Sequence, residues 1–379
     1  FVDLGINFTK VEGGTVHIGL NDGSGLSFED CWLRDHCRCL QCYNYSTFQR
    51  ANHILDIPEA RVKSILNNEK ELLITWDDNH ESSYKLDFLY ENDYNRWIES
   101  RRFKPIIWHG PSVAENVKKV HVDKFLQSVD GAKMVFQSLL DYGVAFIEGV
   151  GATVEATEIV AKALGGVQHT IFGGMWKFTS DAVRADTAYT TLSLATHNDN
   201  TYFTEAAGLQ LLHCLEHTGG TGGDTVLADG YFGATKLKEE HLQDFEFLVN
   251  NEVEGEYIER EDVDGKGHHH KYSAPIIILD KTTKDLKQIR FNVYDRSAMP
   301  LADASDTRTF YRALRNLSQY YQDPKYQWQF KLVPGSIMIV DNFRVLHGRT
   351  AFTGHRVLCG SYVSRSDWLD RARALKLIK

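Results

Sequence analysis

Alternation of apolar and polar residues dominates the first hundred positions of the chain. Residues 16–20 alternate in this way and lead into an Asn-Asp-Gly turn at 21–23, and residues 72–76 form a further apolar stretch with β-branched and aromatic side chains. Alternation with a period of two beside such a turn is typical of β-strands joined in a hairpin. The pattern therefore predicts a small β-rich domain over residues 1–105.

A helical period appears after residue 120 and then gives way to short strands. Phe125, Val129, Met134 and Leu139 recur at roughly helical spacing before Gly143. Similar patterns predict helices at 154–164, 237–250 and 307–321. Short strands are predicted at 144–147, 209–214, 225–228, 275–279, 287–293, 327–333, 336–341, 344–347 and 355–363. Many short strands with few helices predict a mainly β domain with flanking helices, organised as a sandwich or jelly roll, over residues 122–379.

Proline and charge add to this picture. Pro105 and Pro111 indicate a linker at 106–121 between the two domains. The net charge of −9 argues against nucleic acid as a partner, because proteins that grip phosphate backbones usually carry a positive excess. Apolar runs such as 276–279 are far shorter than the roughly 18 residues of a membrane span, so no membrane association is expected.

Half of the six cysteines are crowded together. Cys37, Cys39 and Cys42 form a C-x-C-x₂-C cluster. Thiolates this close favour Zn²⁺, which needs a fourth ligand to complete a closed structural site; the alternative is three unligated thiols. A secreted disulfide scaffold would spread its cysteines through a shorter chain. The other three cysteines, predicted to be ordinary buried thiols, are Cys31, Cys214 and Cys359.

A histidine and an aspartate two positions apart form the first candidate for catalysis. His197 and Asp199 lie on one face if this segment is a strand, although a surface pair of this kind is common. A second histidine, His347, ends an apolar stretch and is followed by glycine. Two histidines and one carboxylate on one face of a divalent ion are the ligand set of non-haem Fe(II) oxygenases, which leaves positions for a co-substrate and O₂.

An arginine in the last predicted strand is the second candidate. Arg356, Leu358, Gly360 and Tyr362 share one face of a strand by their period of two. An arginine that points into an apolar barrel is costly unless it meets an acid, and a dicarboxylate co-substrate would supply one in a bidentate pair. The alternative places Arg356 on the outside of the barrel.

Several stretches, taken together and in order, resemble one known family. Residues 32–37, 175–181, 186–190, 222–225, 341–349 and 352–362 are similar to the Fe(II)/2-oxoglutarate-dependent oxygenases of carnitine biosynthesis. The resemblance spans nearly the whole chain. It implies a double-stranded β-helix (jelly roll) catalytic domain behind a small zinc-binding N-terminal domain, in a homodimer. It also implies the mitochondrial matrix as the location, with the cytoplasm as the alternative, since no transit segment is visible.

The resemblance also carries over the residues of three binding sites. It implies that His197, Asp199 and His347 hold iron, that Arg356 binds 2-oxoglutarate with help from Thr225 and Arg349, and that His80 completes the zinc site. One departure is Asn198, where relatives have Thr; the residue is not a ligand, so the iron assignment stands. The implied chemistry is hydroxylation of free N6-trimethyllysine at C3, the first step of carnitine biosynthesis, with release of succinate and CO₂. Ascorbate is expected as a reductant.

Aromatic residues are expected to surround the trimethylammonium group of the substrate. A quaternary ammonium cannot donate a hydrogen bond and is recognised through the faces of aromatic rings. The resemblance implies such a cage from Phe172, Trp176, Tyr189 and Tyr362, although relatives tend to carry Tyr at position 172. It also implies that Asn292 contacts the substrate carboxylate. Core packing is the alternative for aromatic residues in strands.

Asp186 bears on the choice between two related substrates. Trimethyllysine carries an α-ammonium that γ-butyrobetaine lacks, and leaving that charge buried and unpaired is costly. The resemblance implies Asp at this position in trimethyllysine enzymes and Asn in butyrobetaine enzymes; the alternative is that Asp186 caps a turn or pairs with Arg184.

Two further functions compete with trimethyllysine hydroxylation. One is hydroxylation of γ-butyrobetaine by the same chemistry, and the other is a catalytically silent zinc-binding interaction protein. Retention of both histidines, Asp199 and Arg356 argues against the silent protein. The three histidines at 268–270 follow a run of glycine and charged residues and are predicted to lie in a mobile loop rather than in a metal site.

Overall fold

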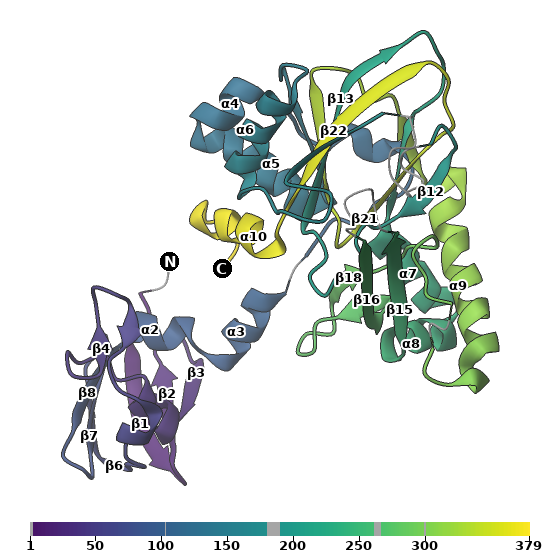
Figure 1. Ribbon diagram of the computed structural model, residues 1–379. Helices are drawn as coiled ribbons and strands as arrows, with labels where there is room; N and C mark the ends of the chain where they lie inside the picture. The colour runs from purple at the N-terminus through teal and green to yellow at the C-terminus, as the bar shows by residue number, and fades with distance from the viewer. Residues whose placement is uncertain (1–2, 103, 180–189, 261–266, 299–300) are drawn as a thin grey trace. The chain divides into compact units, whose positions relative to one another are not determined.

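The computed structural model describes residues 3–102, 104–179, 190–260, 267–298 and 301–379. The chain divides into two compact units, Phe1–Arg102 and Phe103–Lys379 (Figure 1). Each unit has at least one hydrophobic core of its own. Among the described residues, no helix is long and apolar enough to cross a membrane.

The N-terminal unit is built from two antiparallel three-stranded sheets. One contains β1 (Ile6–Glu12), β2 (Thr15–Leu20) and β3 (Gly25–Glu29), and the other β6 (Val62–Asn67), β7 (Glu71–Trp76) and β8 (Glu81–Lys85). The alternating apolar side chains of β2 and β7, such as Ile18 and Ile74, meet in one core. The shorter elements are α1 (Asp30–Asp35), β4 (Tyr43–Asn44), β5 (Gln49–Arg50), α2 (Leu86–Glu91) and α3 (Tyr94–Arg101).

A six-stranded sheet forms one layer of the second unit, with its strands in the order β11-β22-β13-β20-β10-β9. Its bounds along the chain are β9 (Lys119–His121), β10 (Val144–Glu148), β11 (Met175–Phe178), β13 (Leu209–Thr218), β20 (Ser336–Asp341) and β22 (His355–Val363). Neighbouring strands are antiparallel except β9 and β10, which are parallel. The central strand β20 is buried on both faces, as its apolar run of Ile337–Val340 requires.

A four-stranded antiparallel sheet forms the second layer, in the order β12-β21-β14-β19. Its strands are β12 (Leu194–His197), β14 (Thr225–Asp229), β19 (Trp328–Phe330) and β21 (Val345–Arg349). Side chains from both sheets, among them Phe146, Leu212, Leu227 and Trp328, share one core. The candidate residues for catalysis lie on strands of these two sheets or directly after them.

Helices cover the six-stranded sheet on its outer face. They are α4 (Val122–Gln127), α5 (Val129–Tyr142), α6 (Val154–Leu164) and α10 (Arg365–Ala374) (Figure 1). Helix α5 begins where the Ser128 hydroxyl accepts a hydrogen bond from the Gly131 N–H at 2.8 Å. It ends at Gly143, whose φ of 73° suits glycine, and β10 follows at once.

A second group of elements packs beside the four-stranded sheet and shares a further core. It contains α7 (Gly230–Glu240), α8 (Leu242–Asn250), β17 (Ile277–Leu279), β18 (Leu286–Ile289) and α9 (Thr307–Gln322). The helix predicted at 237–250 is thus two helices, which meet at His241 with a φ of −142° and a ψ of 61°. The helices predicted at 154–164 and 307–321 are present.

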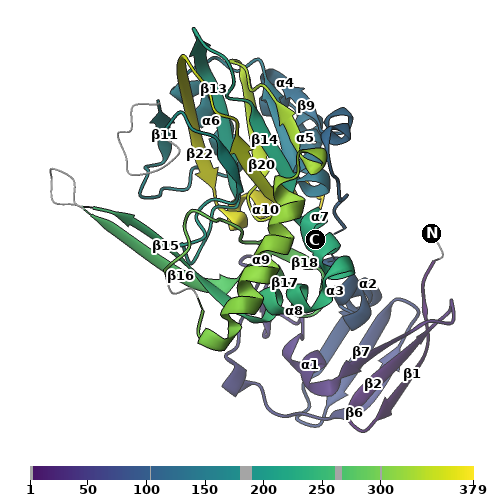
Figure 2. The ribbon, with the colours of Figure 1, turned by 90° about the vertical axis from the view of Figure 1, so that its right-hand side faces the viewer.

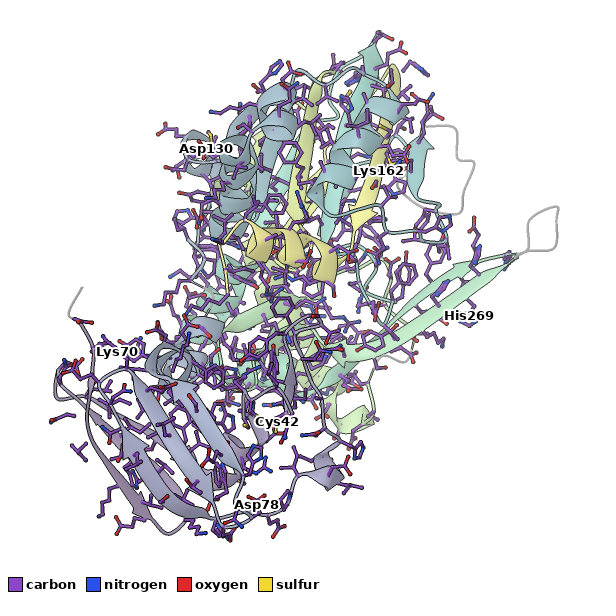
Figure 3. The ribbon with its side chains drawn as sticks, turned by 90° about the vertical axis from the view of Figure 1, so that its left-hand side faces the viewer. Cys42, Lys70, Asp78, Asp130, Lys162 and His269 are labelled. Atoms are coloured by element: carbon purple, nitrogen blue, oxygen red, sulfur yellow. The ribbon has the colours of Figure 1, made fainter. Side chains whose placement is uncertain are left out.

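A long hairpin that the sequence analysis missed projects from this group. Strands β15 (Glu252–Glu259) and β16 (His268–Pro275) pair along their whole length (Figure 2). The prediction of a mobile loop at 268–270 is therefore wrong, because these histidines form the start of β16. Figure 3 shows His269 on this hairpin, where its ring contacts the Glu256 carboxylate at 2.8 Å.

The prediction of a linker at 106–121 is also wrong, because the segment is part of the second unit. The Trp108 side chain is buried in the core between the sheets, and its backbone N–H donates to the Asp229 carboxylate at 3.0 Å. Arg344 holds the Ile106 carbonyl at 2.6 Å. The buried Arg344 and Asp229 thus anchor a segment whose proline and glycine residues are typical of a linker.

Candidate active site

Two histidines and an aspartate converge at the edge of the four-stranded sheet. His197 ends β12, Asp199 follows it, and His347 lies on β21 directly opposite His197 in the strand register. Their ligand atoms lie within 4.8 Å of one another. Asp199 Oδ1 is 3.3 Å from Nε2 of His197 and 3.5 Å from Nε2 of His347. The pairing of two strands that are distant in sequence thus produces the predicted triad.

Asn198 fixes the turn that carries the two neighbouring ligands. Its side-chain amide donates to the Asn342 and Val345 carbonyls at 2.9 and 3.2 Å and accepts from the Phe291 N–H at 3.2 Å. The Asn342 side chain in turn accepts from the Asp199 N–H at 2.9 Å. An amide at position 198 therefore links β12 to the loop before β21, which accounts for asparagine at this departure from the family pattern.

The polar groups of the triad fit a divalent cation. His197 Nδ1 donates to the Ala195 carbonyl at 2.8 Å, so in the neutral ring the lone pair of Nε2 faces the Asp199 carboxylate. Two acceptors this close repel each other unless a cation or a proton lies between them. Two imidazoles and a carboxylate with a common focus are the donor set that suits Fe(II).

Burial and charge act against each other at these three residues. Burial lowers the pKa of His347 to about 4. Burial would raise the pKa of Asp199, but the nearby histidines and a hydrogen bond from Tyr362 hold it well below its usual range. Burial would lower the pKa of His197, but Asp199 raises it above the ordinary value, with a smaller contribution from Asp295. The carboxylate is therefore ionised and available to a metal near neutral pH.

The second carboxylate oxygen of Asp199 is held by two side chains from the six-stranded sheet. Tyr362 Oη donates to Asp199 Oδ2 at 2.7 Å, and Gln210 Nε2 donates to the same oxygen at 2.5 Å. Gln210 and Tyr362 are direct cross-strand partners on β13 and β22. Oδ1 is thereby left to face the histidines. The sequence analysis missed Gln210, since only the strand register brings it to Asp199.

Arg356 lies inside the second unit, as predicted from its period on β22. Its side chain lines the same pocket as the triad, and the residue is only 5% exposed. Burial lowers its pKa, and none of the described residues places a carboxylate within 4.0 Å of its guanidinium. A buried guanidinium that has no carboxylate beside it among the described residues fits an anionic ligand.

Thr225 and Arg349 lie opposite each other on β14 and β21 and line the same pocket. Arg349 Nε donates to the Leu192 carbonyl at 3.2 Å, and its Nη2 donates to the Thr190 carbonyl. The Phe352 ring lies 5.3 Å from the guanidinium carbon of Arg356 and 5.2 Å from that of Arg349. The structure thus brings all three predicted co-substrate residues to one pocket, from both sheets.

The pocket encloses a cavity of about 130 Å³, and several aromatic side chains line it. Trp176 lies 5.5 Å from both Phe178 and Tyr362, measured between ring centres, and Phe172 lies at the pocket with its ring 5.8 Å from that of Tyr257. The predicted site residues Asp186 and Tyr189 lie outside the described residues. Pocket residues that the sequence analysis did not identify include Phe178, Tyr202, Gln210, Tyr294 and Asp295.

Asn292 is buried and lines the pocket, but its side chain forms hydrogen bonds to other residues of the protein. Its amide N–H groups donate to the Asn198 carbonyl at 3.2 Å and to Asp295 Oδ2 at 2.7 Å. Its carbonyl oxygen accepts from the N–H groups of Tyr294 and Asp295 at 2.8 and 3.3 Å. Its contact with a substrate carboxylate stays a prediction.

A second cluster of metal-binding side chains lies in the N-terminal unit. The ligand atoms of Cys37, Cys39, Cys42 and His80 lie within 4.8 Å of one another. His80 Nε2 is 3.2, 3.7 and 3.6 Å from the three sulfurs in that order. Burial raises the pKa of Cys42 to about 12, so this sulfur would be a thiolate near neutral pH only with a cation bound to it.

Two donors surround the Cys42 sulfur, and Figure 3 shows Cys42 in this unit. Arg34 Nη1 lies 3.9 Å from it and Asn52 Nδ2 lies 3.4 Å from it. Cys31 lies outside the cluster, but the prediction that it is buried is wrong, because it is exposed. The predictions for Cys214 and Cys359 are confirmed, because both are buried.

Comparison with known proteins identifies the family. Residues 109–362 match the model of the taurine catabolism dioxygenase TauD, TfdA family, and residues 9–90 match that of the gamma-butyrobetaine hydroxylase-like N-terminal domain. The chain belongs to the TauD, TfdA family. The fold is accordingly a TauD-like oxygenase fold of mostly sheet with some helix. The crystal structure of a taurine dioxygenase from Burkholderia xenovorans aligns with a TM-score of 0.50 at 14% identity, covering 69% of this chain and 90% of that one.

Several dioxygenases are similar in sequence to nearly the whole of this chain. Trimethyllysine dioxygenase of Mus musculus is 39% identical over 94% of this chain and 84% of its own length. The enzyme of the same name from Meyerozyma guilliermondii is 32% identical over 97% and 95%. Gamma-butyrobetaine dioxygenase of Pseudomonas sp. is 28% identical over 94% and 92%. The predictions of a dioxygenase and of Fe(II), 2-oxoglutarate and O₂ as its cofactor and co-substrates are confirmed at the level of the family.

Proposed function

We propose that this enzyme hydroxylates free N6-trimethyllysine at C3, the first step of carnitine biosynthesis, with conversion of 2-oxoglutarate to succinate and CO₂. One observation carries the proposal: a single pocket contains a triad that fits Fe(II), a buried arginine with no acid beside it among the described residues, and a wall of aromatic rings. The names of the most similar relatives favour trimethyllysine over γ-butyrobetaine.

Each part of the pocket has a defined task in this reaction. His197, Asp199 and His347 hold the metal, and bound Fe(II) supplies the activation of O₂ coupled to oxidation of 2-oxoglutarate. Arg356 pairs with the distal carboxylate of 2-oxoglutarate, where the absence of bulk water strengthens the ion pair. Thr225 and Arg349 position the same co-substrate from the opposite sheet.

The aromatic wall positions the other reactant. Trp176 and Tyr362, whose ring centres are 5.5 Å apart, present faces that attract a trimethylammonium group by cation–π contacts worth about 0.5–2 kcal/mol each. Phe172 adds a third ring, and Tyr189 belongs to the same proposal. Holding the charged end at a fixed place aims one C–H bond at the metal, which is the main contribution of a protein to such chemistry.

Several further features belong to this proposal. The two sheets of the second unit form a double-stranded β-helix, and Cys37, Cys39, Cys42 and His80 bind a structural zinc ion with no open position. The enzyme is a homodimer of the mitochondrial matrix, as the mitochondrial relatives suggest, and ascorbate keeps its iron reduced.

The test is a comparison of initial rates with each amine. Purified protein with Fe(II) and 2-oxoglutarate is given trimethyllysine or γ-butyrobetaine, and succinate release is measured; His347→Ala is the control for metal-dependent turnover. We expect turnover with trimethyllysine, little with γ-butyrobetaine, and none in the variant. Faster turnover of γ-butyrobetaine would favour the alternative substrate. No succinate with either amine would contradict the proposal.

A further inference from the structure

A second acidic side chain lies in the pocket beside the metal triad. Among the described residues that line the pocket, the acids are Asp199 and Asp295. Asp199 is a member of the triad, whereas Asp295 has no part in holding the metal or 2-oxoglutarate. Asp295 is half-buried. It comes soon after Phe291, whose backbone forms hydrogen bonds with Asn198 between the two metal ligands.

A network of hydrogen bonds fixes Asp295 relative to the triad. The Asn292 amide donates both to Asp295 Oδ2 at 2.7 Å and to the carbonyl of Asn198 at 3.2 Å, and Asn198 separates His197 from Asp199. The Asp295 carbonyl accepts from the Glu256 N–H of the hairpin at 2.8 Å. The Asp295 side chain is thus held by Asn292 and its backbone by the hairpin, which fixes the residue at the pocket.

The chemistry of the proposed substrate requires an anion at such a position. In trimethyllysine the α-ammonium nitrogen is two bonds from C3, or about 2.5 Å away. When C3 faces the metal, the ammonium must also lie close to the ligands, far from the trimethylammonium end. An ammonium buried there without a carboxylate partner is costly.

We propose that Asp295 binds the α-ammonium group of the amino acid substrate, held in place by Asn292. This inference rests on the proposed function and deepens it, because it defines the substrate class as free α-amino acids with a distal trimethylammonium group. Analogues without the α-ammonium, and trimethyllysine derivatives whose α-amine is acylated, lack the charge that Asp295 recognises. The role predicted for Asp186 concerns the same ammonium and is a separate proposal.

The experiment compares two ligands that differ only in the α-ammonium. These are trimethyllysine and 6-(trimethylammonio)hexanoate, and kcat/KM is measured with each for the wild-type enzyme, Asp295→Asn and Glu256→Gln. Asparagine still accepts the hydrogen bond from Asn292, so the network is kept while the charge is lost. Glu256 is the matched control, because its N–H contacts Asp295 but its carboxylate faces His269 and Lys271. Anaerobic calorimetry gives the affinity for both ligands.

For Asp295→Asn we expect a loss of about 10- to 100-fold in kcat/KM and affinity for trimethyllysine, at the low end for a charge pair because the carboxylate is half-buried. The deaminated ligand should be affected less than about 3-fold, and Glu256→Gln should match the wild type with both. An equal loss with both ligands, or none with trimethyllysine, would overturn the role of Asp295 alone. A wild-type enzyme that does not use trimethyllysine would overturn the proposed function and this inference with it.

Discussion

Arg356 provides a sharp test, because two buried arginines in this chain have opposite surroundings. Arg344 is fully buried and paired with Asp229 at 2.7 Å. Arg356 is 5% exposed with no carboxylate within 4.0 Å in the described part of the chain. We interpret Arg356 as a cation whose partner is the distal carboxylate of 2-oxoglutarate. Replacing each arginine by methionine, of similar length and without charge, separates a ligand-binding arginine from a structural one.

The expected magnitudes follow from these contacts. A charge-assisted hydrogen bond contributes about 1.5–3 kcal/mol. Arg356→Lys keeps the charge but loses one arm of the fork, so it should raise the KM for 2-oxoglutarate by about 10- to 150-fold, and Arg356→Met should raise it further. The KM for the amine should change little. Without 2-oxoglutarate, Arg356→Met should leave the Tm unchanged or raise it, because it removes a desolvated cation.

The assay combines kinetics with thermal unfolding. Initial rates are measured while each substrate is varied, and the Tm is measured with and without 2-oxoglutarate. Wild-type protein should gain stability from 2-oxoglutarate, and Arg356→Met should lose that gain. Arg344→Met, the control, should be destabilised by about 3–5 kcal/mol because it leaves Asp229 buried and unpaired. Equal rises of KM for both substrates, or a large loss of Tm in Arg356→Met without ligand, would refute the assignment.

Three other predictions concern the metal triad, the cysteine cluster and a buried histidine. Gln210→Leu removes a hydrogen bond to Asp199 and should weaken Mn(II) binding to the apoenzyme, measured by calorimetry, by about 10-fold; unchanged affinity would contradict its role. Cys39→Ser should lower the zinc content from about one per chain and reduce the Tm, and equal zinc content in the two proteins would count against the site. Burial lowers the pKa of His213 to about 4, below its ordinary value of 6.5, so the unfolded state binds a proton more readily. The free energy of unfolding should therefore fall by about 3 kcal/mol between pH 6.5 and 4. The fall should be smaller in His213→Gln, and urea titrations at several pH values measure both.

The strands and the first two members of the metal triad could be predicted because their signals are local. The apolar run of β20, the alternation of β2 and the spacing of His197 and Asp199 are all visible within a few residues. The hairpin β15–β16 was missed because only β15 alternates clearly between buried and exposed positions, while β16 begins with three histidines. The anchoring of the segment at 106–121 was missed because it depends on Asp229 and Arg344, which lie far from it in the sequence.

Residues that act through distant partners leave no mark on the local pattern. Gln210 looks like a polar position within an apolar strand, and only its register with Tyr362 brings it to Asp199. Asp295 follows a strand-like segment, and its place at the pocket depends on the bonds of Asn292 to Asn198. The identity of the substrate likewise could not come from spacing; it was implied by family resemblance and is supported by the relatives.

The most direct test of the account is the structure of the product formed from trimethyllysine. The enzyme is incubated with Fe(II), 2-oxoglutarate, ascorbate and trimethyllysine under ¹⁸O₂, and the product is analysed by mass spectrometry and NMR. The account predicts one labelled oxygen, in a hydroxyl group at C3, and about one succinate for each hydroxylated molecule. Hydroxylation at another carbon, or succinate release with unmodified trimethyllysine, would contradict it.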